Sequence, residues 1–161
     1  MPDVKKIIAT AVEFEHFGSE YYMRMMDLVK DPKAKLLMKS LANDEKEHAS
    51  ILEKELKRQG GKARAVSKDM LDKGLKEIFP EKIRKNSIAV KDTIEAIKLG
   101  IRTEKRSIMY YSKNSNTKVK SLDQVFKKLE KIELGHLALL EENLLYLEDD
   151  GVWYGYVPLL D

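Results

Sequence analysis

The amino-acid sequence predicts an all-α fold, a four-helix bundle in which two antiparallel helical hairpins are joined by a long crossover. Four long segments carry apolar side chains at the three- and four-residue spacing of an α-helix. Only four prolines and eight glycines interrupt the 161 residues, so long helices are possible. The breaks in the pattern give two pairs of helices with short turns and one long connection between the pairs. We expect residues 1–161 to form a single domain.

The first predicted helix, residues 4–30, and the second, residues 32–59, form the first hairpin. Asp31 separates them, because its side chain can cap a following helix that has Pro32 in its first turn. The two glycines that follow Gln59 end the second helix. The apolar stripes of this hairpin contain Ile8, Val12, Gly18 or Ser19, Tyr22, Met26, Val29, Leu37, Leu41, Leu52 and Leu56.

The predicted crossover, residues 60–89, contains a short amphipathic segment that ends at Pro80. The third and fourth helices, residues 90–113 and 119–147, are separated by an Asn-Ser-Asn turn and form the second hairpin. An aromatic tail, residues 150–161, closes the chain. The apolar stripes of the second hairpin contain Ile94, Ile97, Ile101, Ile108, Tyr111, Leu122, Val125, Leu129, Leu140 and Leu144.

Ionisable side chains interrupt each of these stripes at positions where apolar residues belong. The first and third helices each contribute one glutamate. The second and fourth each contribute a Glu-x-x-His motif, which places a carboxylate and an imidazole one turn apart on one helix face. The six residues are Glu15, Glu45, His48, Glu104, Glu133 and His136.

The two halves of the chain repeat this layout. Glu15 precedes Tyr22 as Glu104 precedes Tyr111, and the two pairs lie 89 positions apart. The two Glu-x-x-His motifs lie 88 positions apart. A single such motif on a lysine-rich helix usually faces solvent, but two copies in apolar stripes at matching offsets argue against that interpretation. A bundle with pseudo-twofold symmetry would bring all six ionisable groups to one level.

Charge neutrality predicts metal ions at that level. A buried, unpaired carboxylate costs several kcal/mol even after the protein relaxes. Two divalent cations would neutralise four glutamates, with neutral imidazoles completing the ligand set. Carboxylates and imidazoles suit iron and manganese, and zinc can also occupy such a site. We therefore predict a dinuclear metal centre, with two iron ions as the expected occupants.

We do not expect the remaining polar and aromatic residues to bind metal. Tyr22 and Tyr111 are core aromatic residues, each two turns from a candidate ligand, and we expect them to hydrogen-bond to ligand glutamates. The tail residues Trp153 and Tyr154 are expected to cover an end of the bundle or to form a subunit contact, and we expect a homodimer. Side chains predicted to lie on the surface or rim are Glu13, His16, Glu20, Glu47 and Glu141.

Composition excludes several classes of function. The 161 residues contain no cysteine, which excludes disulfides, zinc–thiolate sites, thiolate-bound iron–sulfur clusters and a cysteine nucleophile among them. No segment reaches the ~20 apolar residues of a membrane helix, and no signal-peptide core is present, so we expect a cytoplasmic protein without a membrane partner. With a net charge of +3, the lysine clusters at 82–85 and 127–131 are typical of solvated helix faces rather than of a nucleic-acid site.

The paired motifs resemble those of the ferritin-like di-iron carboxylate superfamily, and within it the rubrerythrin-type domain. The resemblance covers roughly residues 4–147. It implies that Glu15 and Glu104 are terminal carboxylate ligands, and that the two glutamates of the Glu-x-x-His motifs bridge the metals. It also implies imidazole ligation by His48 and His136.

Two features depart from the family pattern. Rubrerythrins carry a second carboxylate one turn from the ligand of the third helix, where this chain has Ile101 and Ser107. They also carry a cysteine-ligated rubredoxin module, for which this sequence has no cysteine. Electrons would therefore have to come from a separate donor protein.

The resemblance leads us to expect a non-haem di-iron oxidoreductase, a rubrerythrin-like peroxidase or oxidase that reacts with peroxide or dioxygen. A bundle that binds or handles iron without turnover is an alternative. A dimanganese catalase is another, and an interaction scaffold that retains an ancestral site is a third.

Overall fold

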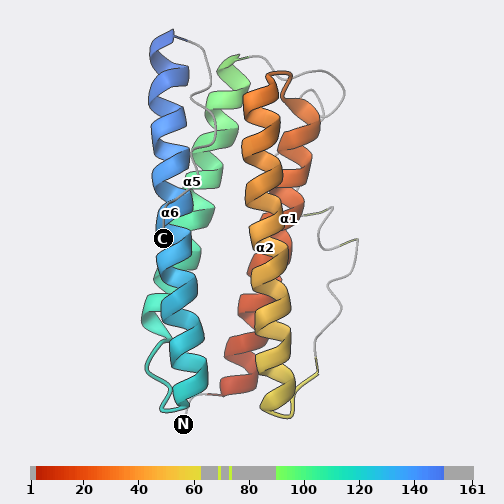
Figure 1. Cartoon of the computed structure of the whole chain (residues 1–161), viewed down its shortest axis with the longest axis vertical. Helices are drawn as coiled ribbons and strands as arrows, with labels where there is room; N and C mark the ends of the chain where they lie inside the picture. The colour runs from red at the N-terminus through yellow and green to blue at the C-terminus, as the bar shows by residue number, and fades with distance from the viewer. Residues whose placement is uncertain (1–2, 63–68, 70–72, 74–89, 151–161) are drawn as a thin grey trace.

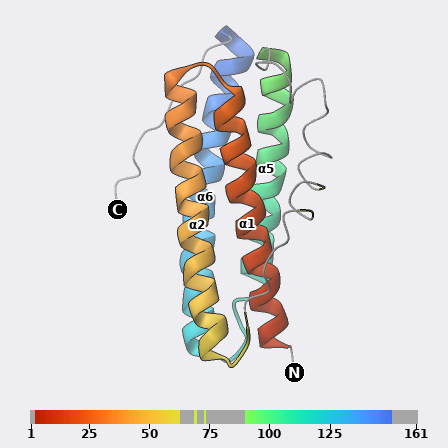
Figure 2. The same cartoon turned by 90° about the vertical axis from the view of Figure 1, so that its right-hand side faces the viewer.

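The computed structural model describes residues 3–62, 69, 73 and 90–150, and these residues form a four-helix bundle (Figure 1). Helix α1 packs closely on α2, and α5 packs closely on α6. The helices of each pair run in opposite directions (Figure 1). The turned view shows α1 beside α5 (Figure 2), and α2 also contacts α6. The predicted all-α bundle is confirmed, with helices α1 Val4–Leu28, α2 Pro32–Arg58, α5 Val90–Lys113 and α6 Lys120–Asp150.

The helix boundaries differ from the prediction by a few residues. Helix α1 ends two residues before residue 30, because Val29 is extended with φ −79° and ψ 145°. Asp31 is also extended, as the residue before a proline must generally be, and its carboxylate accepts a hydrogen bond from the backbone nitrogen of Lys33 at 2.7 Å. The predicted helix start at Pro32 is therefore present. Helix α6 continues three residues past the predicted end at Leu147, so Asp149 and Asp150 lie in its last turn.

Two clusters of buried apolar side chains fill the bundle along its length. One cluster includes Leu37, Leu41 and Leu140, and the other includes Leu52 and Leu129. Among the described residues, the predicted apolar stripes supply seven of the nine buried residues of the second cluster and seven of the sixteen of the first, because side chains at helical spacing face one side of each helix. Residues 41 and 52 of α2 flank the Glu-x-x-His motif, as residues 129 and 140 of α6 do. The candidate site therefore lies between the two apolar clusters.

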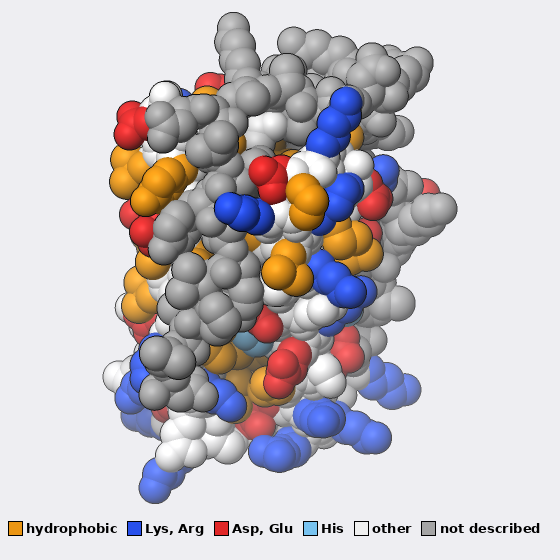
Figure 3. Space-filling view, turned by 45° about the horizontal axis from the view of Figure 1, so that its top comes forward, with side chains coloured by type: hydrophobic (Ala, Val, Ile, Leu, Met, Phe, Trp, Pro, Cys, Tyr) orange, Lys and Arg blue, Asp and Glu red, His pale blue; other side chains and the backbone are white. Residues whose placement is uncertain are grey.

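The outer faces of the described helices are mixed in charge. Basic and acidic side chains are interspersed on the face shown in Figure 3. Large apolar side chains such as Met109 and Leu145 are exposed on individual turns. Within the described residues, no helix is long and apolar enough to cross a membrane.

Parts of the prediction fall outside the described residues. They include the amphipathic segment of the crossover, with Met70, Leu71, Leu75, Ile78, Phe79 and Pro80. They also include the aromatic tail, with Trp153 and Tyr154.

Candidate metal centre

Six ionisable side chains from all four helices meet inside the bundle. Helices α1 and α5 contribute one glutamate each, and α2 and α6 contribute a glutamate and a histidine each. All six are buried, with at most 4% of each residue exposed. They are the residues predicted as ligands: Glu15, Glu45, His48, Glu104, Glu133 and His136.

The six residues form two overlapping groups, each with the composition of a metal site. One group consists of Glu15, Glu45, His48 and Glu133, and the other of Glu45, Glu104, Glu133 and His136. Within each group, one candidate ligand atom per residue lies within 4.8 Å of all the others. Glu45 and Glu133 belong to both groups, which is the position that a bridging carboxylate requires.

The two imidazoles present the same nitrogen to the carboxylates. Nδ1 of His48 lies 3.1 Å from Oε1 of Glu133, and Nδ1 of His136 lies 3.0 Å from Oε2 of the same glutamate. The two rings are nearly parallel, at 16°, with centroids 5.9 Å apart. This arrangement follows from the repeated Glu-x-x-His motif, because each helix places its histidine one turn beyond its glutamate on the inner face.

Two buried tyrosines each donate a hydrogen bond to a glutamate of the opposite hairpin. The hydroxyl of Tyr22 in α1 donates to Glu104 in α5, and the hydroxyl of Tyr111 in α5 donates to Glu15 in α1. Burial first, and then the charge of its partner glutamate, raises the pKa of each tyrosine well above its usual value. Both hydroxyls therefore remain protonated donors at neutral pH, and each orients one oxygen of its partner glutamate.

Two buried carboxylate oxygens lack a hydrogen bond, and a bound metal ion could serve as the partner of each. Oε2 of Glu15 lies 3.3 Å from Nδ1 of His48, and Oε1 of Glu45 lies 3.1 Å from Nδ1 of His136. Each Nδ1 makes its hydrogen bond to Glu133 instead, and a ring nitrogen carries at most one hydrogen. These two carboxylate oxygens have no hydrogen-bond donor, so bound cations would supply a partner for them. Oxygen and imidazole donors fit a di-iron centre.

Without metal, three of the carboxyl groups are held towards their neutral form. Burial is the main cause that raises the pKa of Glu15, Glu45 and Glu104, and the charges of neighbouring glutamates raise it further. Glu133 behaves differently. Its burial alone would raise its pKa, but hydrogen bonds from Glu104 and from both histidines hold it well below the usual value. Glu133 is therefore the carboxylate that remains ionised in the metal-free cluster.

Both histidines are held towards their protonated form. Burial alone would lower the pKa of His48, but its hydrogen bond to Glu133 and the nearby charges of Glu15 and Glu133 raise it to about 9. Burial also acts to lower the pKa of His136, and its contacts with Asp44 and with the cluster glutamates raise it well above its usual value. Metal ions must displace these protons to bind, because only the neutral imidazole is a ligand.

Gly18 allows helix α1 to approach the cluster closely. A Cβ atom at this position would lie 2.8 Å from Oε2 of Glu45, closer than carbon and oxygen normally approach. The apolar stripe of α1 was predicted to pass through Gly18 or Ser19, and both are buried. A side chain at position 18 would displace a carboxylate that belongs to both metal groups.

The residues predicted to lie on the surface are outside the cluster. His16 is 36% exposed in its side chain and pairs with Glu53 at 2.9 Å. Glu20, Glu47 and Glu141 are exposed and Glu13 is partly exposed.

Sequence reasoning missed two polar residues that the structure connects to buried groups. Asp44 contacts Nε2 of His136 at 3.0 Å, and its place directly before a candidate ligand was the only available signal. Glu55 is buried and accepts hydrogen bonds from Ser121, Arg58 and Gln59, so its partners are structural.

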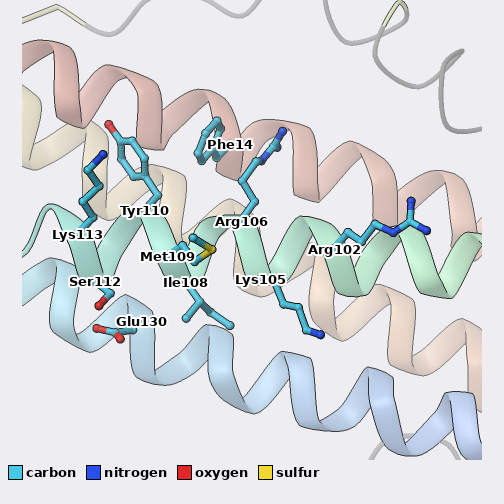
Figure 4. A pocket seen from close by; sticks show the side chains of 10 residues that line it. All are labelled: Phe14, Arg102, Lys105, Arg106, Ile108, Met109, Tyr110, Ser112, Lys113 and Glu130. Carbon is cyan, nitrogen blue, oxygen red and sulfur yellow. The ribbon is translucent and has the colours of Figure 1, made fainter.

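A surface groove of about 750 Å³ is lined mainly by residues of α5, with Phe14 of α1 and Glu130 of α6 (Figure 4). The Arg106 guanidinium lies 4.3 Å from the centroid of the Phe14 ring, and burial lowers the pKa of this arginine. Lys105 and Glu130 also line the groove, together with Met109. Among the described residues, none that lines the groove belongs to the groups that could hold a metal.

The comparison with protein families gives one match. A family model described as Rubrerythrin matches residues 6–144, which include all six candidate ligands and both tyrosines. No curated protein and no solved structure matches the chain significantly.

Proposed function

The chain belongs to the rubrerythrin family, and from this premise we propose that it is a non-haem di-iron oxidoreductase that reacts with peroxide or dioxygen. The observation that carries the proposal is the overlap of two buried ligand groups that share Glu45 and Glu133. Two shared carboxylates would hold two metal ions side by side.

The six residues would divide the ligand roles by their place in the groups. Glu15 and His48 would complete one metal position, and Glu104 and His136 the other, with the two shared glutamates as bridges. When bound, two iron ions supply the two electrons that reduction of an O–O bond consumes. Reduction of hydrogen peroxide to two waters also consumes two protons.

The remaining residues would position the ligands and keep water away from them. Tyr22 and Tyr111 each hold one oxygen of a terminal glutamate through their hydroxyl protons. Leu52 and Leu129 belong to the apolar cluster on one side of the site, and Leu41 and Leu140 to the cluster on the other. Such a site lies in a region of low dielectric, where charges interact strongly.

The source of the electrons for this reaction is a separate part of the proposal. The sequence contains no cysteine, so it has no thiolate-ligated relay. We expect a separate donor protein of the rubredoxin type. The expectations of a homodimer and of a cytoplasmic location likewise stay predictions.

Two alternatives differ in what the bound metal does. A bundle that binds or handles iron without turnover would use the same six residues, as would a dimanganese catalase. The metal content, the response to peroxide and the release of oxygen gas distinguish them.

Metal analysis of the anaerobically purified chain, followed by mixing with peroxide, tests the proposal. We expect two iron ions per chain, and loss of both in the double variant H48A/H136A, because that variant removes one ligand from each position. H16A is the matched control, because His16 pairs with Glu53 outside the cluster. Unchanged metal content in the double variant would overturn the ligand assignment.

The reaction itself is followed by the optical change of the di-ferrous protein on one addition of peroxide. We expect one oxidation per centre, and further cycles only when a rubredoxin-type donor is added. Absence of any optical change would favour the non-catalytic alternative. Oxygen evolution from a manganese-loaded chain would favour the catalase.

A further inference from the structure

The two histidines of the proposed metal centre differ in the hydrogen-bond partner of Nε2, the ring nitrogen that faces away from the cluster glutamates. Nε2 of His136 in α6 lies 3.0 Å from Oδ2 of Asp44 in α2, while its Nδ1 faces the cluster glutamates. The Asp44 side chain is 46% exposed and that of His136 only 2%. The contact therefore joins a carboxylate at the rim of the bundle to a ligand in its core.

A carboxylate at this distance fixes the state of the imidazole. The Nε2–H group donates to Asp44, so the lone pair of the neutral ring lies on Nδ1, which faces the metal groups. A carboxylate acceptor also makes the ring a stronger donor towards a metal ion and fixes its orientation. Asp44 is thus a positioning residue for His136 and not itself a ligand.

The internal repeat has no carboxylate at the position that corresponds to Asp44. At the offset of 88 positions that relates the two Glu-x-x-His motifs, Asp44 corresponds to Ile132. An isoleucine side chain accepts no hydrogen bond. No residue in the described part of the chain hydrogen-bonds to Nε2 of His48, whose interactions are through Nδ1.

The other members of the two metal positions match across the repeat. Glu15 and Glu104 each accept a hydrogen bond from one tyrosine of the opposite hairpin. Glu45 and Glu133 belong to both positions. The two sets of ligands are therefore similar except at one position of the repeat, where the first half has Asp44 and the second half has Ile132.

We propose that Asp44 makes the two metal positions unequal, so that the position containing His136 binds the first ion more tightly than the position containing His48. The inference rests on the proposed metal-binding function and adds an order of filling to it. An extra carboxylate beside one position also contributes favourable electrostatic energy to a cation there.

Titration of the metal-free full-length chain with Co²⁺, followed by visible absorption, tests the inference. Co²⁺ is a stable substitute for Fe²⁺, and its absorption reports the ligands that surround it. We expect two binding steps of unequal affinity in the unmodified chain. In D44N and D44A the tighter step weakens by about 10–100-fold, the usual effect of losing such a partner, while the weaker step is unchanged.

A matched control separates the hydrogen bond from a general effect of charge. E47Q removes one negative charge from an exposed position on the same helix and leaves both binding steps unchanged. Circular dichroism of the metal-free variants checks that the helices are intact, which we expect because Asp44 is half-exposed. Proton NMR of the Co²⁺-loaded chain adds a direct readout. The Nε2–H signal of one histidine exchanges slowly with water, and D44A makes that signal alone exchange rapidly.

The possible failures are distinguishable. Two Co²⁺ ions bound with the same constants in the unmodified chain and in D44A would overturn the inference and leave the metal centre in place. Equal weakening of both steps, or an equal effect of E47Q, would overturn it as well. Absence of Co²⁺ binding to the unmodified chain would overturn the proposed metal centre itself, and the inference with it.

Discussion

At Gly18, helix α1 lies in contact with the carboxylate of Glu45. A glycine in the middle of a helix costs up to about 1 kcal/mol relative to alanine, so its presence there needs a reason. The reason is steric, because a Cβ atom at this position would lie 2.8 Å from the Glu45 Oε2 atom. The residue is therefore small because the site requires it.

We predict that G18A weakens metal binding without weakening the metal-free fold. The added methyl group displaces the carboxylate of Glu45, which belongs to both metal groups, and the affinity for Co²⁺ falls by about 10-fold or more, as for other changes beside a metal ligand. Alanine favours the helix, which offsets the strain in the free energy of unfolding. Co²⁺ titration and urea unfolding measure the two effects.

G100A is the matched control for this substitution. Its added Cβ would lie 2.9 Å from the hydroxyl oxygen of Tyr21, which is not a candidate ligand. We expect G100A to lower stability and to leave the Co²⁺ affinity unchanged. Equal metal affinity in G18A and the unmodified chain would show that Glu45 can move at no cost to the site.

At the scale of the single element, the start of α6 depends on hydrogen bonds between two side chains and the backbone. Oδ1 of Asp123 accepts from the backbone nitrogen of Thr117 at 2.8 Å and from its hydroxyl at 2.7 Å. The same Thr117 hydroxyl oxygen accepts from the backbone nitrogen of Val119 at 3.2 Å. These bonds satisfy backbone donors of the turn that leads into the helix. They fix the turn where Lys118 has a positive φ of 69°.

We predict that D123N lowers the free energy of unfolding by about 1 kcal/mol near neutral pH, a typical value for one hydrogen-bonding interaction. Slight burial acts to raise the pKa of Asp123, but the hydrogen bonds from Thr117 and Lys118 hold it below its usual value. The folded-state pKa is thus lower than the unfolded one. The stabilisation is complete above the unfolded pKa and is lost as the pH falls through the folded one.

Urea unfolding of the metal-free chain between neutral pH and about pH 3 measures this difference, since the unfolded carboxyl titrates near pH 4. The gap between the unmodified chain and D123N should close towards acid. D149N is the control, because Asp149 is exposed near the other end of the same helix. A gap that stays constant over this pH range would mean that ionised Asp123 is not the cause.

At the scale of the whole molecule, the candidate metal centre draws on all four helices, because each contributes at least one candidate ligand. Contacts within each hairpin are close, while contacts between the hairpins are fewer. Metal ions bound by all four helices would therefore join the two hairpins.

We predict that metal raises the stability of the bundle. Ligand that binds only the folded state adds about 4 kcal/mol when its free concentration is 1,000 times the dissociation constant. Thermal unfolding with and without a chelator measures this effect. The double variant H48A/H136A should show little difference between the two conditions. An unchanged melting temperature of the unmodified chain after chelation would show that the centre and the fold are uncoupled.

The stabilisation by metal should also depend on pH. The pKa of His48 is raised to about 9, and those of Glu45 and Glu104 are raised by burial, so these groups hold protons that metal must displace. Metal binding therefore releases protons, and the affinity falls as the pH falls. Calorimetry in two buffers of different ionisation enthalpy measures the protons released.

The sequence by itself determined the fold class and the six candidate ligands. Helical periodicity is local, so the apolar stripes of the four helices could be read along the chain. Glu45 and His48 were recognisable because they interrupt one stripe, and the 88-position repeat linked them to Glu133 and His136 in the other half. Burial of so much charge required a counter-charge, and that argument needed no coordinates.

Only the tertiary structure decided which side chains meet across helices. The sequence placed Tyr22 two turns from Glu15, yet its hydroxyl donates to Glu104 of the other hairpin. It gave no partner for Asp44, which reaches His136 on α6. Periodicity gives the face of a helix on which a residue lies. The relative height and rotation of two helices result from the packing of many side chains at once, and no motif in the sequence encodes them.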